Sequence, residues 1–251
     1  MRSPSLLEFD WQLPPGVRAA FTTRRGGVSV APWDSFNVAT HVNDDPAHVA
    51  ANRAHLAELL GLRGNPVWLN QVHGVSVCDL DVTHAPAATV TADASVTSRS
   101  GAVCVVMVAD CLPVLFCSRD GSRIGAAHAG WRGLASGVLE ATVRALGGPS
   151  DGLRAWLGPC ISRAHFEVGE EVREEFVKQD AAAAACFAKN ARDRWQADLV
   201  GLARHRLAAL GIADISGGSW CTFADSERFY SHRRDGIGGR MAALIWRVPA
   251  L

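Results

Sequence analysis

The feature that most constrains the fold is a series of short Val- and Thr-rich segments between residues 66 and 129. Each is bounded by Gly, Pro or Asp, which is the pattern of successive β-strands separated by turns. Within it, VCVVMV at residues 103–108 is apolar at every position, and such a run is typical of a strand buried on both faces. We therefore expect strands over residues 66–74, 75–82, 89–97, 102–111, 113–118 and 123–129.

Helical patterns lie on both sides of this region. Residues 45–61 begin with Asp45 as a helix N-cap and Pro46 in the first turn, and they end at Gly61; these are common start and stop signals of a helix. A second helix is expected over residues 131–148, where apolar residues recur near helical spacing before a Gly-Gly-Pro stop. The other expected elements are helices over 168–179 and 196–210, a helix or helix end over 180–189, and strands over 17–23, 153–159 and 241–248.

This combination of many strands with three or four helices indicates a mixed α/β or α+β protein. Residues 1–251 contain no internal repeat, linker or low-complexity run, so a single domain is the simplest interpretation. Lys and Arg together number 25, and so do Asp and Glu. Because this balance gives no broad charged surface, we expect no nucleic-acid partner and no anionic membrane partner. The sequence carries no signal for an oligomeric state.

Two features of the sequence bear on cellular location. No run of about 18 apolar residues occurs, so no membrane span is expected, and the first residues lack the apolar core of a signal peptide. The chain has seven cysteines at irregular spacing. An odd number without an export signal favours reduced thiols and a cytoplasmic location.

Three segments each place a side chain that can bind metal near an expected strand end: LNQVHG with His73, VADCLP with Cys111, and AAHAGWRG with His128. The 38 and 17 residues between them are too many for a His-x-x-x-His helical site, but three strand ends can supply such spacings. One thiolate and two neutral imidazoles suit zinc, and three protein ligands leave its fourth position open for catalysis.

The residues alone leave other interpretations of these side chains open. A buried cysteine commonly packs as a small apolar residue, and a histidine commonly serves as a hydrogen-bonded polar group. Cys111 and His128 also suit a nucleophilic pair without metal, in which the imidazole holds the thiolate. Asp110, which precedes Cys111, suits either the partner that orients a ligand histidine or the cap of the following turn.

Arginines gather beside glycines at two places in the sequence. TTRRGG contains Arg24 and Arg25, and YSHRRDGIGGR contains Arg233 and Arg240. Arginine forks bind phosphate through paired hydrogen bonds, and glycine turns form anion-binding nests. Solvated basic loops would show the same pattern, so the residues alone do not separate these interpretations.

Taken together, the motifs resemble the YfiH family, also called the laccase-domain or multicopper polyphenol oxidoreductase family. The likeness spans about residues 17–248, and its most specific parts are ADCLPVLF and AAHAGWRG. The chain departs from the family pattern at Cys160, where a small residue is common, and at His232, where an aromatic residue is usual. The motifs occur in the family's order: TTRRGGVS, SFNVATHVNDDPAHVAANR, WLNQVHG, ADASVT, VADCLPVLF, AAHAGWRG, WLGPCI, FEVG and GGR.

The resemblance implies an α/β fold with mixed sheets packed as a sandwich and helices outside. It implies a zinc site formed by His73, Cys111 and His128, with Asp110 as a candidate proton carrier. Within TTRRGG it assigns the site role to Arg24, which with Arg233 or Arg240 would position phosphate. The implied activity is phosphorolysis of adenosine, inosine, guanosine and methylthioadenosine, together with deamination of adenosine.

Three other functions remain as alternatives. The first is a cytosolic editing hydrolase that acts on a misloaded UDP-muropeptide with the same three residues. The second is a binding or redox protein in which the site merely holds metal. The third is a copper polyphenol oxidase, which the older family label implies, but the nine histidines include none of the His-x-His pairs that hold copper in such oxidases.

Overall fold

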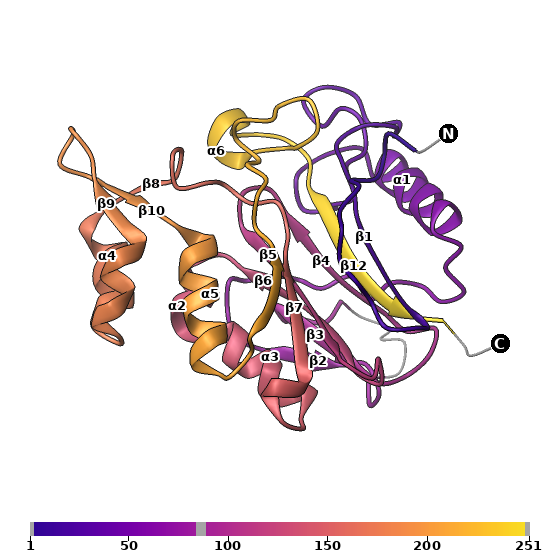
Figure 1. The fold of residues 1–251 in the computed structure, drawn as a ribbon. Coiled ribbons are helices and arrows are strands. Elements are labelled where there is room, and N and C mark those ends of the chain that lie inside the picture. Colours follow the sequence, from indigo (N-terminus) through magenta and orange to yellow (C-terminus); the bar gives the residue numbers. More distant parts are fainter. Residues whose placement is uncertain (1–2, 84–88, 249–251) are drawn as a thin grey trace.

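Two sheets packed face to face form the centre of the protein (Figure 1). The computed structural model describes residues 3–83 and 89–248. The smaller sheet is antiparallel, in the order β1–β12–β4, and consists of β1 (Val17–Phe21), β12 (Met241–Arg247) and β4 (Val103–Val108). The larger sheet has six strands of mixed direction in the order β11 (Asp214–Gly217), β7 (Leu153–Leu157), β5 (Leu112–Ser118), β6 (Ile124–Ala129), β3 (Ala94–Thr97) and β2 (Val77–Asp79).

Strand β4 shows how the sequence specifies this packing. Successive strand side chains point to opposite faces. Cys104, Val106 and Val108 face the core between the two sheets, and Val103, Val105 and Met107 face the other side of the small sheet. All six are buried. The burial on both faces that VCVVMV predicts is confirmed.

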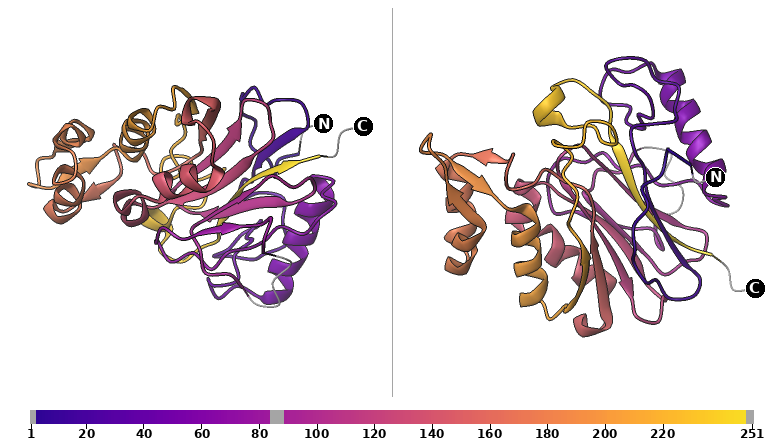
Figure 2. Two further views of the ribbon diagram at one scale, coloured as in Figure 1. Left: turned by 90° about the horizontal axis from the view of Figure 1, so that it is seen from below. Right: turned by 45° about the horizontal axis from the view of Figure 1, so that its top comes forward.

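Helices cover the outer faces of both sheets, which gives a layered α/β arrangement (Figures 1 and 2). Helix α1 (Pro46–Leu59) packs on the small sheet through Leu56. Helices α2 (Trp131–Ser136), α3 (Val138–Leu146) and α5 (Leu199–Ala209) pack on the large sheet around an apolar core. The expected mixed sheets, packed as a sandwich with flanking helices in one domain, are confirmed. No helix within residues 3–83 and 89–248 has the length and apolar character of a membrane span.

A third, small sheet extends the molecule beyond α5 and carries α4 (Figure 1). It is antiparallel in the order β8–β10–β9. Its strands explain why two expected helices begin late, because residues 168 and 196–197 belong to strands. Its elements are β8 (Glu167–Val168), α4 (Glu170–Val177), the 3₁₀ helix η2 (Ala181–Cys186), β9 (Phe187–Lys189) and β10 (Trp195–Ala197). Two short helices elsewhere complete the described fold, η1 (Ser150–Gly152) and α6 (His232–Asp235).

Two further expectations are wrong, each for a local reason. The helix expected over residues 131–148 is two helices, because Gly137 takes a left-handed conformation (φ 98°) that ends α2 and begins α3. The strand expected over residues 66–74 does not form. Its only backbone pairing with other described residues is the bridge from Asn70 to Thr91. Gln71 holds the segment instead, through hydrogen bonds of its side chain to both backbone groups of Met107 (2.7 and 2.8 Å).

The loop before α1 depends on one buried side chain of that helix, so Asn52→Ala should destabilise the fold. The Asn52 amide is 1% exposed and bonds at 2.8–3.2 Å to four groups of this loop: Val28 N, Ser29 Oγ, Ser35 O and Asn37 O. Buried groups left without partners are costly. We expect chemical denaturation to show a loss of about 2–4 kcal/mol. The exposed Glu58→Ala on the same helix should change stability by less than about 0.5 kcal/mol, and an Asn52→Ala value that small would contradict the assignment.

Candidate metal centre

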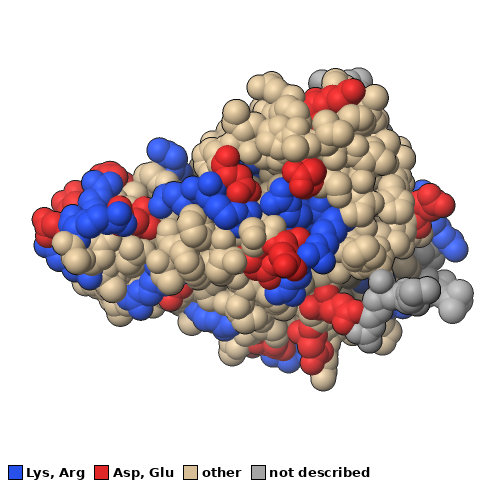
Figure 3. All heavy atoms as spheres, turned by 90° about the horizontal axis from the view of Figure 1, so that it is seen from above, with Lys and Arg blue, Asp and Glu red and all other residues tan. Residues whose placement is uncertain are grey.

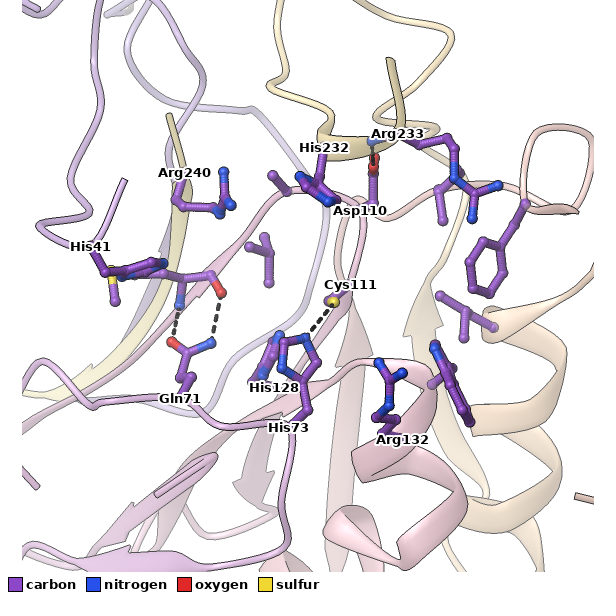
Figure 4. Close-up of a pocket in the computed structure, with 17 residues that line it drawn as sticks. His41, Gln71, His73, Asp110, Cys111, His128, Arg132, His232, Arg233 and Arg240 are labelled. Atoms are coloured by element: carbon purple, nitrogen blue, oxygen red, sulfur yellow. Dashed lines mark hydrogen bonds between the residues drawn. The ribbon is translucent and has the colours of Figure 1, made fainter. Parts of the chain in front are cut away.

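The three side chains predicted to bind metal meet at one end of the sandwich (Figure 4). The ligand atoms of His73, Cys111 and His128 all lie within 4.8 Å of one another. Cys111 Sγ is 3.7 Å from His73 Nε2, and the two imidazole rings meet edge to face at 4.8 Å. Within the described ranges, this is the one group of three or more His, Cys, Asp or Glu side chains placed to hold a metal ion.

Strand ends do not account for all three positions. Cys111 lies in the turn from β4 to β5 and His128 is the penultimate residue of β6, as expected, but His73 lies in a segment without a strand. His73 also has a left-handed backbone (φ 61°), and so does Asp110 (φ 86°). A residue other than glycine held in this region costs about 1–3 kcal/mol, so surrounding interactions must fix it.

Asp93, which the sequence analysis did not select, supplies these interactions at His73. Its buried carboxylate accepts backbone N–H bonds from Val72, His73 and Gly74 (3.2, 2.9 and 2.7 Å) and lies 2.9 Å from His128 Nδ1. Its backbone oxygen accepts the His128 N–H at 2.7 Å. Burial works to raise the pKa of Asp93, but the hydrogen bonds from His128 and the loop amides hold it below its usual value. One carboxylate thus positions two of the three candidate ligands.

The donor set fits a tetrahedral metal ion. With metal–sulfur and metal–nitrogen bonds of about 2.3 and 2.1 Å, ligand sulfur and nitrogen lie about 3.6 Å apart, close to the observed 3.7 Å. Because His128 Nδ1 faces Asp93, its Nε2 is free to coordinate, which is a common arrangement of metal-bound histidine. A Cβ on Gly130 would lie 2.9 Å from Cys111 Sγ and 2.7 Å from His73 Cδ2, so this position requires glycine.

The same three groups interact electrostatically. Burial works to raise the pKa of Cys111, but the charge and hydrogen bonds of His128 and His73 lower it to about 6. Burial works to lower the pKa of His128, but the Cys111 thiolate and the Asp93 carboxylate raise it to about 9. The thiol is therefore held as the thiolate, the form that binds metal.

A cavity of about 470 Å³ opens beside these ligands. Its walls contain the side chains of Arg132, Arg233 and Arg240 but only one carboxylate, that of Asp110. The outer surface near α6 is different, because its Arg side chains lie among Asp and Glu side chains (Figure 3). The cavity is lined by His41, Gln71, His73, Met107, Val108, Ala109, Asp110, Cys111, His128, Trp131, Arg132, Ile161, Phe166, Leu199, His232, Arg233 and Arg240.

The predicted arginines occupy different environments. Arg240 and Arg233 line the cavity. Arg24 does not, because its guanidinium pairs with Asp34 at 3.3 Å and lies 3.9 Å from Asp235. His41 and Gln71 also line the cavity; neither is predicted from the sequence, although both lie in motifs that carry the family resemblance.

Asp110 lines the cavity but does not orient a ligand histidine, a role that Asp93 fills. Its carboxylate accepts hydrogen bonds from Thr222 Oγ1, Ser231 Oγ and Arg233 N at 2.6, 3.0 and 2.7 Å. These bonds fix the turn that carries Cys111. Cys160, the departure from the family pattern, is a buried free thiol whose backbone pairs with that of Cys221 in an isolated β-bridge, and it is not among the residues that line the cavity.

Comparison with known proteins establishes the family. The model of the multi-copper polyphenol oxidoreductase laccase family matches residues 18–248. The chain belongs to this family. A Pseudomonas aeruginosa protein named as a purine nucleoside phosphorylase is 53% identical over 94% of this chain and 96% of its own. The purine nucleoside phosphorylase YfiH of Escherichia coli is 50% identical over 95% and 97%.

Solved structures of family members share the whole fold. A Neisseria meningitidis protein of the DUF152 family superposes with a TM-score of 0.93 at 43% identity, covering 98% of this chain and 100% of its own. The hypothetical protein YfiH of Bacillus licheniformis gives a TM-score of 0.88 at 30% identity, covering 98% and 97%. The layered architecture is therefore a property of the family.

The role of Asp93 is testable through metal affinity. Asp93→Asn removes the charge that holds His128 Nδ1 and weakens the acceptor of the 72–74 amides, so metal affinity should fall about 10- to 100-fold. Competition with a chromophoric chelator measures it. Asp81→Asn is the matched control, since Asp81 also accepts hydrogen bonds from Thr97 and Ser98 but lies outside the cavity. Equal affinity in the two variants would refute the role given to Asp93.

Proposed function

We propose that this chain is a zinc-dependent purine nucleoside phosphorylase that also deaminates adenosine. The observation that carries the proposal is the His73–Cys111–His128 group at the wall of a cavity large enough for a nucleoside. The names of the relatives in P. aeruginosa and E. coli support the phosphorylase part. The substrates proposed are adenosine, inosine, guanosine and methylthioadenosine.

The donor set supports zinc as the metal. One thiolate and two imidazoles suit Zn²⁺ better than Mg²⁺ or Ca²⁺, which prefer oxygen ligands. When bound with an open position, zinc supplies Lewis-acid polarisation of a water or substrate oxygen. The chain's part is to hold Cys111 as the thiolate and to keep His128 Nε2 free through the Asp93 contact.

In phosphorolysis, a phosphate oxygen forms a bond to the anomeric carbon of the ribose while the bond to the purine nitrogen breaks, and the base leaves with a proton. We assign phosphate orientation to Arg240 or Arg233, since both line the cavity. Arg24 acts indirectly, because its guanidinium lies 3.9 Å from Asp235, the last residue of the helix that carries Arg233. In deamination, water adds to the purine carbon that bears the amine and ammonia leaves.

Proton transfer in either reaction is assigned to Asp110. Asp110 is among the residues that line the cavity next to Cys111, and the hydroxyl groups of Thr222 and Ser231 donate hydrogen bonds to its carboxylate. We place the reaction in the cytoplasm, because a free Cys111 thiolate persists in a reducing compartment. The substrate partners are then a purine nucleoside and phosphate.

Copper polyphenol oxidation is less consistent with the residues. The group His73, Cys111 and His128 is one set of ligands, enough for one ion, and the described residues contain no second such group. A multicopper centre requires several sets. The muropeptide-editing alternative uses the same three ligands, so a substrate assay must separate it from the phosphorylase.

Replacement of Cys111 tests the proposal. The purified protein should contain about one zinc per chain and release base from inosine or adenosine only when phosphate is present. Cys111→Ala should lose the zinc and lower turnover by at least about 100-fold, because the ion's Lewis-acid contribution is lost. Cys186→Ala is the matched control, since Cys186 lies in η2 outside the cavity and should keep both zinc and activity.

Other outcomes would redirect the assignment. Full zinc content in Cys111→Ala would remove Cys111 from the ligand set. Turnover of a UDP-muropeptide, with no purine nucleoside turned over, would favour the editing hydrolase. Activity that depends on copper and oxygen would favour the polyphenol oxidase.

A further inference from the structure

We propose that His41 and Arg240 form the phosphate subsite of the cavity and that the purine base binds at the opposite wall, beside Trp131 and Phe166. This inference rests on the proposed phosphorylase function and states how the substrates are oriented in the cavity. The ribose lies at the metal, between the two subsites. It assigns His41 a role in substrate binding and takes Arg233 away from phosphate.

The two sides of the cavity differ in chemistry. Arg240 and His41 lie on one side of the candidate metal ligands, and Arg132 and Arg233 lie on the other (Figure 4). The guanidinium of Arg132 stacks on Trp131 at 4.5 Å, and that of Arg233 on Phe166 at 5.4 Å. The second side is therefore an aromatic wall with cations on its surface, which suits a flat heterocycle.

Arg240 differs from the other two cavity arginines in what surrounds its guanidinium. Among the described residues no carboxylate lies within 4.0 Å of its guanidinium, and it has no aromatic ring beneath it, whereas Arg132 and Arg233 stack on aromatic rings. Burial lowers the pKa of Arg240, although the negative charges of Cys111 and Asp110 act in the opposite direction. Partial burial disfavours a charged guanidinium, and an anion bound directly to it would favour the charged form.

His41 lines the cavity on the same side as Arg240 (Figure 4). Burial and then the positive charge of Arg240 lower the pKa of His41. No hydrogen bond, ion pair or ring contact engages its imidazole in the part of the chain that the structure describes. A guanidinium cation and an imidazole N–H donor that face one cavity can both donate hydrogen bonds to an oxyanion, and the bound anion would favour protonation of His41.

The geometry of this side is fixed before any anion binds. Arg240 Nη1 donates to the backbone oxygens of Gly238 and Gly239 at 3.0 and 2.9 Å, which holds one end of the fork. The Arg240 backbone N–H donates to Asn37 Oδ1 at 3.0 Å, and the Asn37 amide also accepts from Ala39 at 3.0 Å. Asn37 thus ties Arg240 to the loop that carries His41. A preorganised site loses little freedom on binding.

Titration with inorganic phosphate tests the subsite in the zinc-loaded protein. Arg240→Gln and His41→Gln should each weaken phosphate binding in calorimetry, by about tenfold to a hundredfold for Arg240, because a charge-assisted contact is lost. In steady-state assays, Arg240→Gln should raise the KM for phosphate by a similar factor while the KM for the nucleoside changes less than about twofold. Arg240→Lys should recover part of the loss. Arg25→Gln is the control, because Arg25 pairs with Glu227 on the surface.

Variants of the opposite wall should affect nucleoside binding and leave phosphate binding nearly unchanged. Phe166→Ala should raise the KM for the nucleoside and leave phosphate affinity within about twofold. If Arg132→Gln or Arg233→Gln abolishes phosphate binding while Arg240→Gln retains it, the subsites are reversed and the inference is overturned. If the wild-type protein turns over no purine nucleoside, the proposed function fails. Loss of calorimetric phosphate binding in Arg240→Gln would then still support the anion subsite, and unchanged binding would contradict it.

Discussion

The contact on which the candidate site depends is the one between Asp93 and the two histidines. The buried Asp93 carboxylate lies 2.9 Å from His128 Nδ1 and accepts the backbone N–H of His73, also at 2.9 Å. It therefore joins a rigid strand of the large sheet to a segment without a strand of its own. Without the Asp93 carboxylate, the hydrogen bond that holds the left-handed backbone of His73 would be lost, and His128 Nε2 would not be fixed toward the cavity.

The layered fold places the third ligand against this pair. Strand β4 belongs to the small sheet and β5 to the large one, so the chain crosses between sheets at Asp110 and Cys111. The crossing is tight, with Asp110 in a left-handed conformation held by hydrogen bonds from Thr222, Ser231 and the Arg233 backbone. Cys111 consequently projects at the end of the sandwich, where His73 and His128 also lie. The packing of these two sheets thus both buries the core between them and positions the candidate metal ligands.

Much of this arrangement is predictable from local sequence. The VCVVMV run predicts a strand buried on both faces, and the helix signals at Asp45 and Gly61 bracket α1 closely. The motifs at His73, Cys111 and His128 identify three side chains that the structure brings together. These signals succeed because burial and capping depend on neighbouring residues. The break at Gly137 is less visible, since one glycine is compatible with an uninterrupted helix and only its left-handed backbone ends α2.

The long-range contacts are not predictable in this way. Asp93 lies 35 residues from His128, and nothing in ADASVT indicates that its carboxylate turns inward. Gln71 replaces an expected strand with side-chain bonds to Met107, which a β-like composition does not reveal. Arg24 matches a family motif yet lies outside the cavity, whereas His41 lies inside it.

X-ray absorption at the zinc edge of the purified protein tests the central claim most directly, because it reports the atoms bound to the metal. We expect one zinc per chain with a single sulfur at about 2.3 Å and two histidine nitrogens at about 2.0–2.1 Å, completed by one light atom. A shell without sulfur, or with two or more sulfurs, would contradict the assignment of His73, Cys111 and His128 as the ligands.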